Sequence, residues 1–118
     1  MKVIQSSFEL SKIDYYKTHF KILNAVLPID ITDKEIDILS NFLSLPVEMT
    51  NENMFNSMTR KKVIEALTLT NGGMSNHLKN MKKKGYLIRN GEYLIIHPNL
   101  LPAHSVQGYN FKLKTKNE

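Results

Sequence analysis

The 118-residue sequence contains no cysteine, and this absence excludes several kinds of site at once. Without a thiol there is no disulfide, no thiolate-bound zinc, no iron–sulfur cluster and no cysteine nucleophile. Apolar runs are short, since none approaches the roughly 18 residues of a membrane span, and the start of the chain lacks the apolar stretch of a signal peptide. We therefore expect a cytoplasmic protein without redox chemistry or a membrane partner.

Sequence motifs of enzymes and metal sites are also missing. The chain has no Walker loop, no GxSxG elbow and no HExxH motif. An acidic cluster at residues 30–37 lacks the spacing and the central glycine of a calcium loop, and it coincides with a helix start, where carboxylates are favourable. The histidines are scattered without metal-ligand spacing, at His19, His77, His97 and His104. The sequence thus predicts no enzyme, no bound metal and no cofactor.

The composition that remains is that of one soluble globular domain with a net positive charge. It is 42% hydrophobic and 23% charged, with a net charge of +5. The formal charges of residues 28–56 sum to −5. Those of residues 57–90 sum to +7, because this segment has eight basic residues and a single carboxylate, that of Glu65. Those eight are Arg60, Lys61, Lys62, Lys79, Lys82, Lys83, Lys84 and Arg89. One face should therefore attract phosphate groups.

Hydrophobic spacing and capping residues predict two helices in the first part of the chain. Ser11 can cap a helix that runs to about Val26 and ends before Pro28. Residues 32–35 read as a capping box, which begins a second helix that Pro46 closes. The polar residues 46–57 that follow are expected to form a loop with a short strand or turn.

Two further helices are predicted in the basic part of the chain. One begins near Thr59 and carries cations in its first turns, at the unfavourable end of the helix dipole, so we expect a ligand such as phosphate to explain them. The next is capped by Thr70, runs over residues 71–84 and ends at Gly85. Its apolar stripe is Met74, Leu78 and Met81. The opposite face has amides and ammonium groups but no carboxylate, and comprises Gly72, Asn76, Lys79, Asn80 and Lys83.

The last part of the chain is predicted to be β-structure. Residues 86–89 and 92–97 flank Asn90-Gly91, which is typical of a type I′ hairpin turn. Residues 109–114 alternate apolar and polar side chains and are expected to add a strand, before a frayed end at residues 115–118.

Residues 59–97 are predicted to contain, in this order, a helix, a short connector, a second helix, a glycine that ends it and a hairpin. This order, and the stretch Leu67-Thr68-Leu69-Thr70-Asn71-Gly72-Gly73-Met74-Ser75-Asn76-His77-Leu78-Lys79 with its continuation to Arg89, resembles the winged helix-turn-helix family. The similarity is to MarR-like and ArsR-like regulators, RepL-type replication initiators and small phage regulators, and it covers about residues 33–97. It implies an α+β, mainly α fold, with an N-terminal helical extension (1–30), a winged helix-turn-helix domain (31–100) and a C-terminal extension (101–118).

The chain departs from this family in two places. The connector over residues 46–57 is longer than such domains need. Gly72 and Gly73 open the fourth helix although glycine is a poor helix former. Either these glycines let the backbone approach a phosphate closely, or the first turn is loop-like.

The resemblance implies that the fourth helix enters the major groove of duplex DNA. Asn76 would read adenine and Lys79 would reach guanine or phosphate, while Arg89 and Asn90 at the wing would reach a minor groove or phosphate. The full set of candidate DNA-binding residues is Arg60, Lys61, Lys62, Asn71, Gly72, Gly73, Ser75, Asn76, Lys79, Asn80, Lys82, Lys83, Arg89 and Asn90.

The function expected from this reading is sequence-specific binding of double-stranded DNA by a transcriptional regulator encoded by a phage or mobile element. A homodimer, held by the first helix and the strand-like tail, would place two helices in successive major grooves. Two alternatives stay open: a replication initiator, or a protein-interaction module that binds RNA polymerase or a phage assembly.

Overall fold

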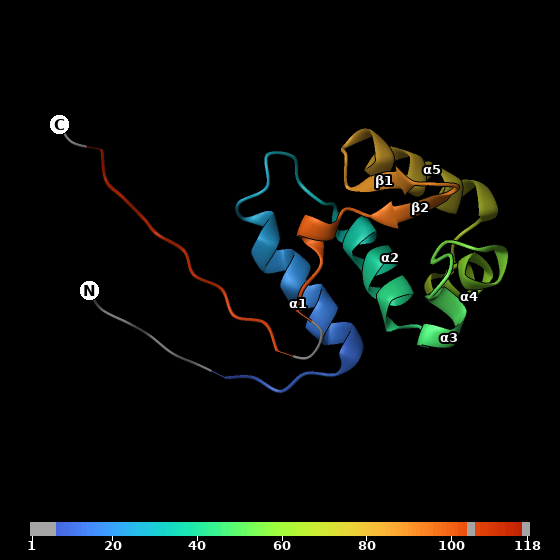
Figure 1. Ribbon diagram of the computed structural model, residues 1–118, viewed down its shortest axis with the longest axis horizontal. Coiled ribbons are helices and arrows are strands. Elements are labelled where there is room, and N and C mark those ends of the chain that lie inside the picture. Colours follow the sequence, from blue (N-terminus) through green and yellow to red (C-terminus); the bar gives the residue numbers. More distant parts are fainter. Residues whose placement is uncertain (1–6, 104–105, 117–118) are drawn as a thin grey trace.

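A computed structural model describes residues 7–103 and 106–116 of the chain. In this part of the chain five helices precede a two-stranded antiparallel hairpin, so the fold is α+β and mainly helical, as expected (Figure 1). The elements are α1 (Lys12–Asn24), α2 (Asp33–Ser44), α3 (Val47–Thr50), α4 (Ser57–Leu67), α5 (Asn71–Lys83), β1 (Leu87–Asn90), β2 (Tyr93–Ile96) and a short 3-10 helix (Pro98–Leu100).

The predicted helix ends are confirmed at four positions. Ser11 caps α1, and Thr32 and Glu35 form both hydrogen bonds of the capping box at the start of α2. The hydroxyl of Thr70 accepts a hydrogen bond from the backbone N–H of Gly73, at 2.9 Å. Gly85 has a φ angle of +82° just after α5, the left-handed conformation that glycine adopts most easily.

The prediction of a loop over residues 46–57 is correct for residues 51–56, which form turns and bends, and wrong for Val47–Thr50, which form the short helix α3. The side-chain oxygen of Asn56 accepts a hydrogen bond from the backbone N–H of Thr59, so α4 begins at Ser57 rather than near Thr59. Thr59 is buried inside the first turn, where its hydroxyl donates to the carbonyl oxygen of Met54 at 2.7 Å. Phe55 anchors the segment edge to face on Phe42 of α2, with 4.7 Å between ring centroids.

The hairpin is confirmed, but its turn lies one residue later than predicted. Asn90 pairs with Tyr93, so Gly91 and Glu92 form the turn. Only Gly91 has a positive φ angle, +65°, which fits a type II′ turn with glycine at the first central position rather than a type I′ turn. This register places the buried side chains of Leu87 and Ile96 opposite each other.

The predicted strand over residues 109–114 is wrong, since the structure contains no strand in residues 106–116. In Figure 1 this segment runs away from the hairpin as an extended chain. Alternation of apolar and polar residues describes a strand only where another strand offers its edge, and none does so among the described residues.

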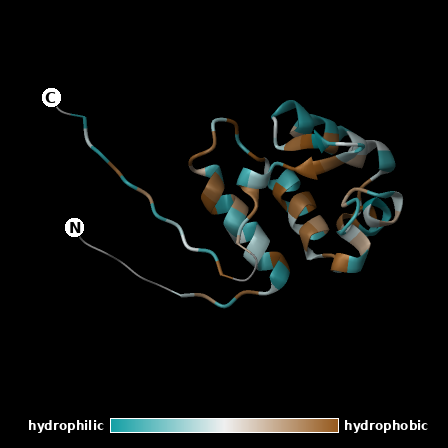
Figure 2. Ribbon diagram, in the orientation of Figure 1, coloured by the Kyte–Doolittle hydropathy of each residue, from teal (hydrophilic) through white to brown (hydrophobic). Residues whose placement is uncertain are grey.

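One hydrophobic core connects the helices and the hairpin. The expected apolar stripe of α5 is buried in it, and Phe20 of α1 belongs to the same cluster as the side chains of α2. α1 packs on α2, α2 on α4, and α5 on both α4 and β1. Figure 2 shows hydrophobic residues along α2 and β2 and mainly hydrophilic ones along α5. None of the described helices has the length and apolar character needed to cross a membrane.

His19 joins α1 to the C-terminal segment. Its side chain is 4% exposed, with Nε2 at 2.7 Å from the carbonyl oxygen of Leu100 and Nδ1 at 2.6 Å from the hydroxyl of Tyr109. A carbonyl oxygen can only accept, so Nε2 carries the proton and Nδ1 accepts from Tyr109. Burial lowers the pKa of His19 below its usual value, and the hydrogen bond to Leu100 offsets part of this shift.

We predict that acid destabilises the protein through His19. Because its pKa is lowered in the folded state, the unfolded chain binds the proton more readily, and the free energy of unfolding falls as the pH drops below the ordinary histidine value of about 6.5. Urea unfolding between pH 7.5 and 5.5 measures this loss, which should be smaller in His19→Gln. An equal loss in both proteins would contradict the prediction.

Candidate nucleic-acid interface

The fourteen candidate residues lie on α4, on α5 and on β1, and α5 packs against the other two elements. Two of them, Arg60 and Gly73, are half-buried, and the others are exposed. The candidate residues of α4 and β1 therefore lie around α5.

α5 has one face in the core and the other in solvent. Met74 and Met81 are 1% and 0% exposed, whereas Asn76 and Lys79 are exposed. Within the described residues, the side chains of Asn76 and Lys79 have no hydrogen-bond or ion-pair partner. Their polar groups are thus available to a ligand.

The two glycines at the start of α5 have different environments. Both lie inside the helix, which begins at Asn71, so the loop-like first turn is excluded. A Cβ atom on Gly73 would lie 3.0 Å from the capping hydroxyl of Thr70, so a side chain there would crowd the cap. A Cβ atom on Gly72 would meet nothing within 4 Å, so no contact inside the described chain requires the missing side chain.

A shallow cavity of about 450 Å³ lies between the starts of α4 and α5. Its polar lining includes Lys61 from α4 and the two α5 residues Asn71 and Ser75. Arg60 lines this cavity and also a second one of about 300 Å³ farther along the same side of α5.

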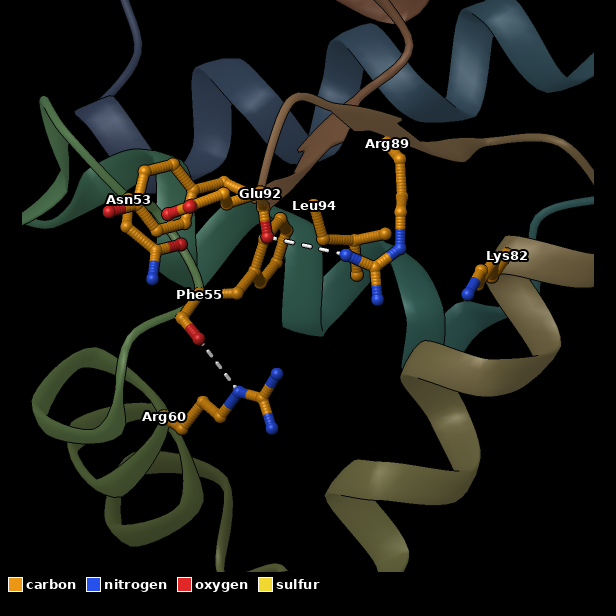
Figure 3. Close-up of a pocket in the computed structure, with 8 residues that line it drawn as sticks. Asn53, Phe55, Arg60, Lys82, Arg89, Glu92 and Leu94 are labelled. Atoms are coloured by element: carbon orange, nitrogen blue, oxygen red, sulfur yellow. Dashed lines mark hydrogen bonds between the residues drawn. The ribbon is translucent and has the colours of Figure 1, made fainter.

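The second cavity brings together three cations from three elements, Arg60 of α4, Lys82 of α5 and Arg89 of β1 (Figure 3). We call these three residues, with Phe55 and Leu94 beneath them, the basic notch. Nε of Arg60 donates to the carbonyl oxygen of Phe55 at 2.8 Å, and Nη1 of Arg89 donates to that of Glu92 at 3.3 Å. Arg89 of the hairpin therefore shares this cavity with Lys82 of α5.

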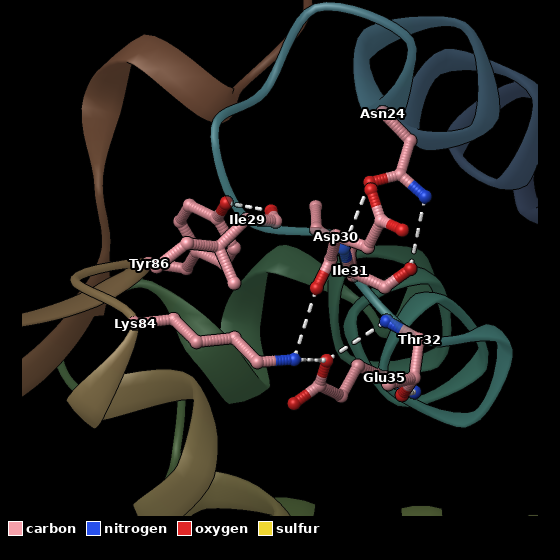
Figure 4. Close-up of polar contacts among 8 residues, drawn as sticks. All are labelled: Asn24, Ile29, Asp30, Ile31, Thr32, Glu35, Lys84 and Tyr86. Atoms are coloured by element: carbon pink, nitrogen blue, oxygen red, sulfur yellow. Dashed lines mark hydrogen bonds and ion pairs between the residues drawn. The ribbon is translucent and has the colours of Figure 1, made fainter.

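Lys84 has a different position from the other basic residues of this region. Its Nζ lies 2.6 Å from Oε1 of Glu35 and 3.0 Å from the carbonyl oxygen of Asp30 (Figure 4). Glu35 is 2% exposed, and the same Oε1 accepts the backbone N–H of Thr32 at 2.9 Å. Lys84 therefore neutralises the buried carboxylate of the capping box, and the eight cations counted in the sequence leave seven for a ligand.

Further hydrogen bonds hold the same region. The hydroxyl of Tyr86 donates to the carbonyl oxygen of Ile29, and the amide of Asn24 bonds both the N–H and the carbonyl oxygen of Ile31. The end of α5 is thus fixed to the segment before α2. No local sequence pattern indicated these contacts, because Lys84 and Glu35 are 49 positions apart.

The described residues contain no group of three histidine or acidic side chains placed to hold a metal ion. Comparison of the chain with protein-family models, with curated proteins and with solved structures finds no match.

We predict that Lys84→Met destabilises the protein far more than Lys83→Met does. Losing Lys84 leaves the buried carboxylate of Glu35 without its cation, at a cost of roughly 2–4 kcal/mol. Lys83 is the adjacent exposed lysine, whose loss should change stability by less than about 0.5 kcal/mol. Urea unfolding of the two variants measures both values, and equal effects would contradict the assigned role of Lys84.

Proposed function

We propose that this protein is a winged helix-turn-helix regulator that binds double-stranded DNA sequence-specifically. The main support is the exposed face of α5, a rigid helix that presents amides and ammonium groups without a carboxylate. The order α2, α4, α5 and β1–β2 agrees with the resemblance to that family, with the hairpin as a short wing.

In this proposal α5 enters the major groove, which is wide enough to admit a helix. Asn76 donates and accepts at the edge of an adenine, and Lys79 reaches a guanine or a phosphate. Lys61 and Lys62, exposed near the start of α4, contact the DNA backbone and fix the position of α5. Asn90 lies at the end of β1, next to the turn of the wing.

The distribution of charge also favours a polyanionic ligand. The ion pairs among the described residues are Lys17 with Asp37 and Lys84 with Glu35. Both carboxylates belong to α2, so neither pair neutralises the exposed lysines of α4 and α5. These lysines therefore repel one another, and phosphate groups relieve that repulsion.

The proposed biological role is regulation of transcription by occupancy of an operator in the cytoplasm of a phage-infected or element-bearing host. A replication initiator would use the same contacts at an origin. A module that binds RNA polymerase or a phage assembly would instead bind duplexes weakly and without sequence preference, so the selection experiment below separates it from the other two.

We expect the protein to be a homodimer. Large apolar side chains are exposed on the segments flanking the folded part, with Phe8 81%, Phe111 51% and Leu113 97% exposed. Burial of such side chains between two copies is favourable. Sedimentation equilibrium should give twice the 13.6 kDa of the chain, and a species of only 13.6 kDa at working concentration would reject the dimer.

Selection from a randomised duplex pool at about 150 mM salt tests sequence-specific binding, because nonspecific phosphate attraction is weak and unselective there. The wild type should enrich a motif, and Asn76→Ala with Lys79→Ala should lose it. The matched control is Asn51→Ala with Lys34→Ala, which removes the same side-chain types from exposed positions outside α4, α5, the hairpin and the flanking segments, and should keep the motif.

Failure of the wild type to enrich any motif would move the proposal to the protein-interaction module. If the control variant also lost the motif, selection of the motif would not depend specifically on α5.

A further inference from the structure

Both arginines of this chain are in the basic notch. Of its 16 basic residues only Arg60 and Arg89 are arginines, and they reach the notch from different elements, 29 positions apart in the sequence. The guanidinium group forms paired hydrogen bonds with phosphate, which the ammonium group of lysine does not. Both arginines thus lie where their planar N–H groups can form paired hydrogen bonds with a phosphate.

The two guanidinium groups are already positioned. A backbone carbonyl accepts one N–H of each, that of Phe55 for Arg60 and that of Glu92 for Arg89. Figure 3 shows the remaining nitrogens, together with Nζ of Lys82, directed toward the same opening. A ligand therefore binds without the full entropic cost of ordering these long side chains.

Among the described residues, no acidic side chain lies within 4.0 Å of the three positive charges. Glu92 lines the notch, but it is its backbone carbonyl that contacts Arg89. The floor is apolar, since Phe55 is 3% exposed and Leu94 is partly buried in the core. Low polarity beneath the cations strengthens their attraction for an anion.

We propose that the basic notch binds one phosphate group, with Arg60 and Arg89 as hydrogen-bond donors and Lys82 as a third positive charge. The cavity of about 300 Å³ has room for a phosphate with its attached sugar. Resting on the proposed function, this phosphate belongs to the DNA backbone, so Arg89 fixes the position of the wing rather than reading a minor groove. A free phosphate monoester is the other source of the same chemistry.

The first arm of the test observes the arginines directly, without DNA. Two arginines give two Nε–Hε signals in a ¹⁵N-edited NMR spectrum, and Arg89→Lys assigns them by removing one. Inorganic phosphate should shift both signals along one saturable curve, whereas sodium chloride at equal ionic strength should not. Identical responses to the two salts, or a shift of only one arginine, would overturn the notch as a phosphate site.

The second arm identifies the source of the phosphate by the salt dependence of binding to the selected duplex. Arg89→Gln should weaken binding to all sequences alike and reduce the slope of log K against log salt by about 1, with the motif unchanged. Lys34→Gln removes the same charge from an exposed position on α2 and should leave the slope unchanged. An unchanged slope in Arg89→Gln, with the motif still dependent on Asn76 and Lys79, would reject the backbone contact and leave the proposed function standing.

Failure of the proposed function can also be distinguished from failure of the notch as a phosphate site. If no duplex is selected while a nucleoside monophosphate saturates both arginine signals, the proposed function fails and the notch is a site for free phosphate monoesters.

Discussion

The ion pair between Lys84 and Glu35 is the contact on which the arrangement of the other elements depends. Glu35 is buried because it completes the capping box of α2, and its carboxylate there requires a cation. Lys84, the residue that follows α5, supplies that cation at 2.6 Å and also holds the carbonyl of Asp30. Glu35 thus caps the start of α2 and, through its ion pair with Lys84, fixes the end of α5 relative to α2. Tyr86 makes the attachment stronger by binding Ile29 (Figure 4).

This attachment determines which side of α5 faces solvent. With its C-terminal end held against α2 and Met74, Leu78 and Met81 in the core, the helix cannot rotate about its axis without exposing them. The amides and lysines of the opposite side are therefore presented in a fixed orientation. A rigid element of this kind suits base-edge recognition, in which small displacements break hydrogen bonds.

Lysines and arginines have separate places on this surface. The lysines of α4 and α5 are exposed and strongly hydrated, and they suit long-range attraction of a polyanion. The two arginines are held by backbone carbonyls over an apolar floor, and they suit a geometric contact with one phosphate. Different side chains would then have different tasks. The lysines would attract a polyanion from a distance, and the arginines would fix its position by binding one phosphate.

The sequence by itself determined the elements whose signals are local. Thr32 with Glu35, Thr70, Gly85 and the glycine of the hairpin mark their boundaries through backbone hydrogen bonds a few residues away, and the spacing of Met74, Leu78 and Met81 marks the buried side of α5. Local signals misplaced the start of α4 and the register of the turn by one or two residues, and the structure buries Thr59, Leu87 and Ile96 at these places. Only the tertiary structure decided that Lys84 pairs with Glu35, that Arg60 and Arg89 share one notch, and that residues 109–114 have no strand partner within the described part of the chain. These contacts join residues far apart in the chain, and no periodicity or motif encodes which distant partner a side chain meets.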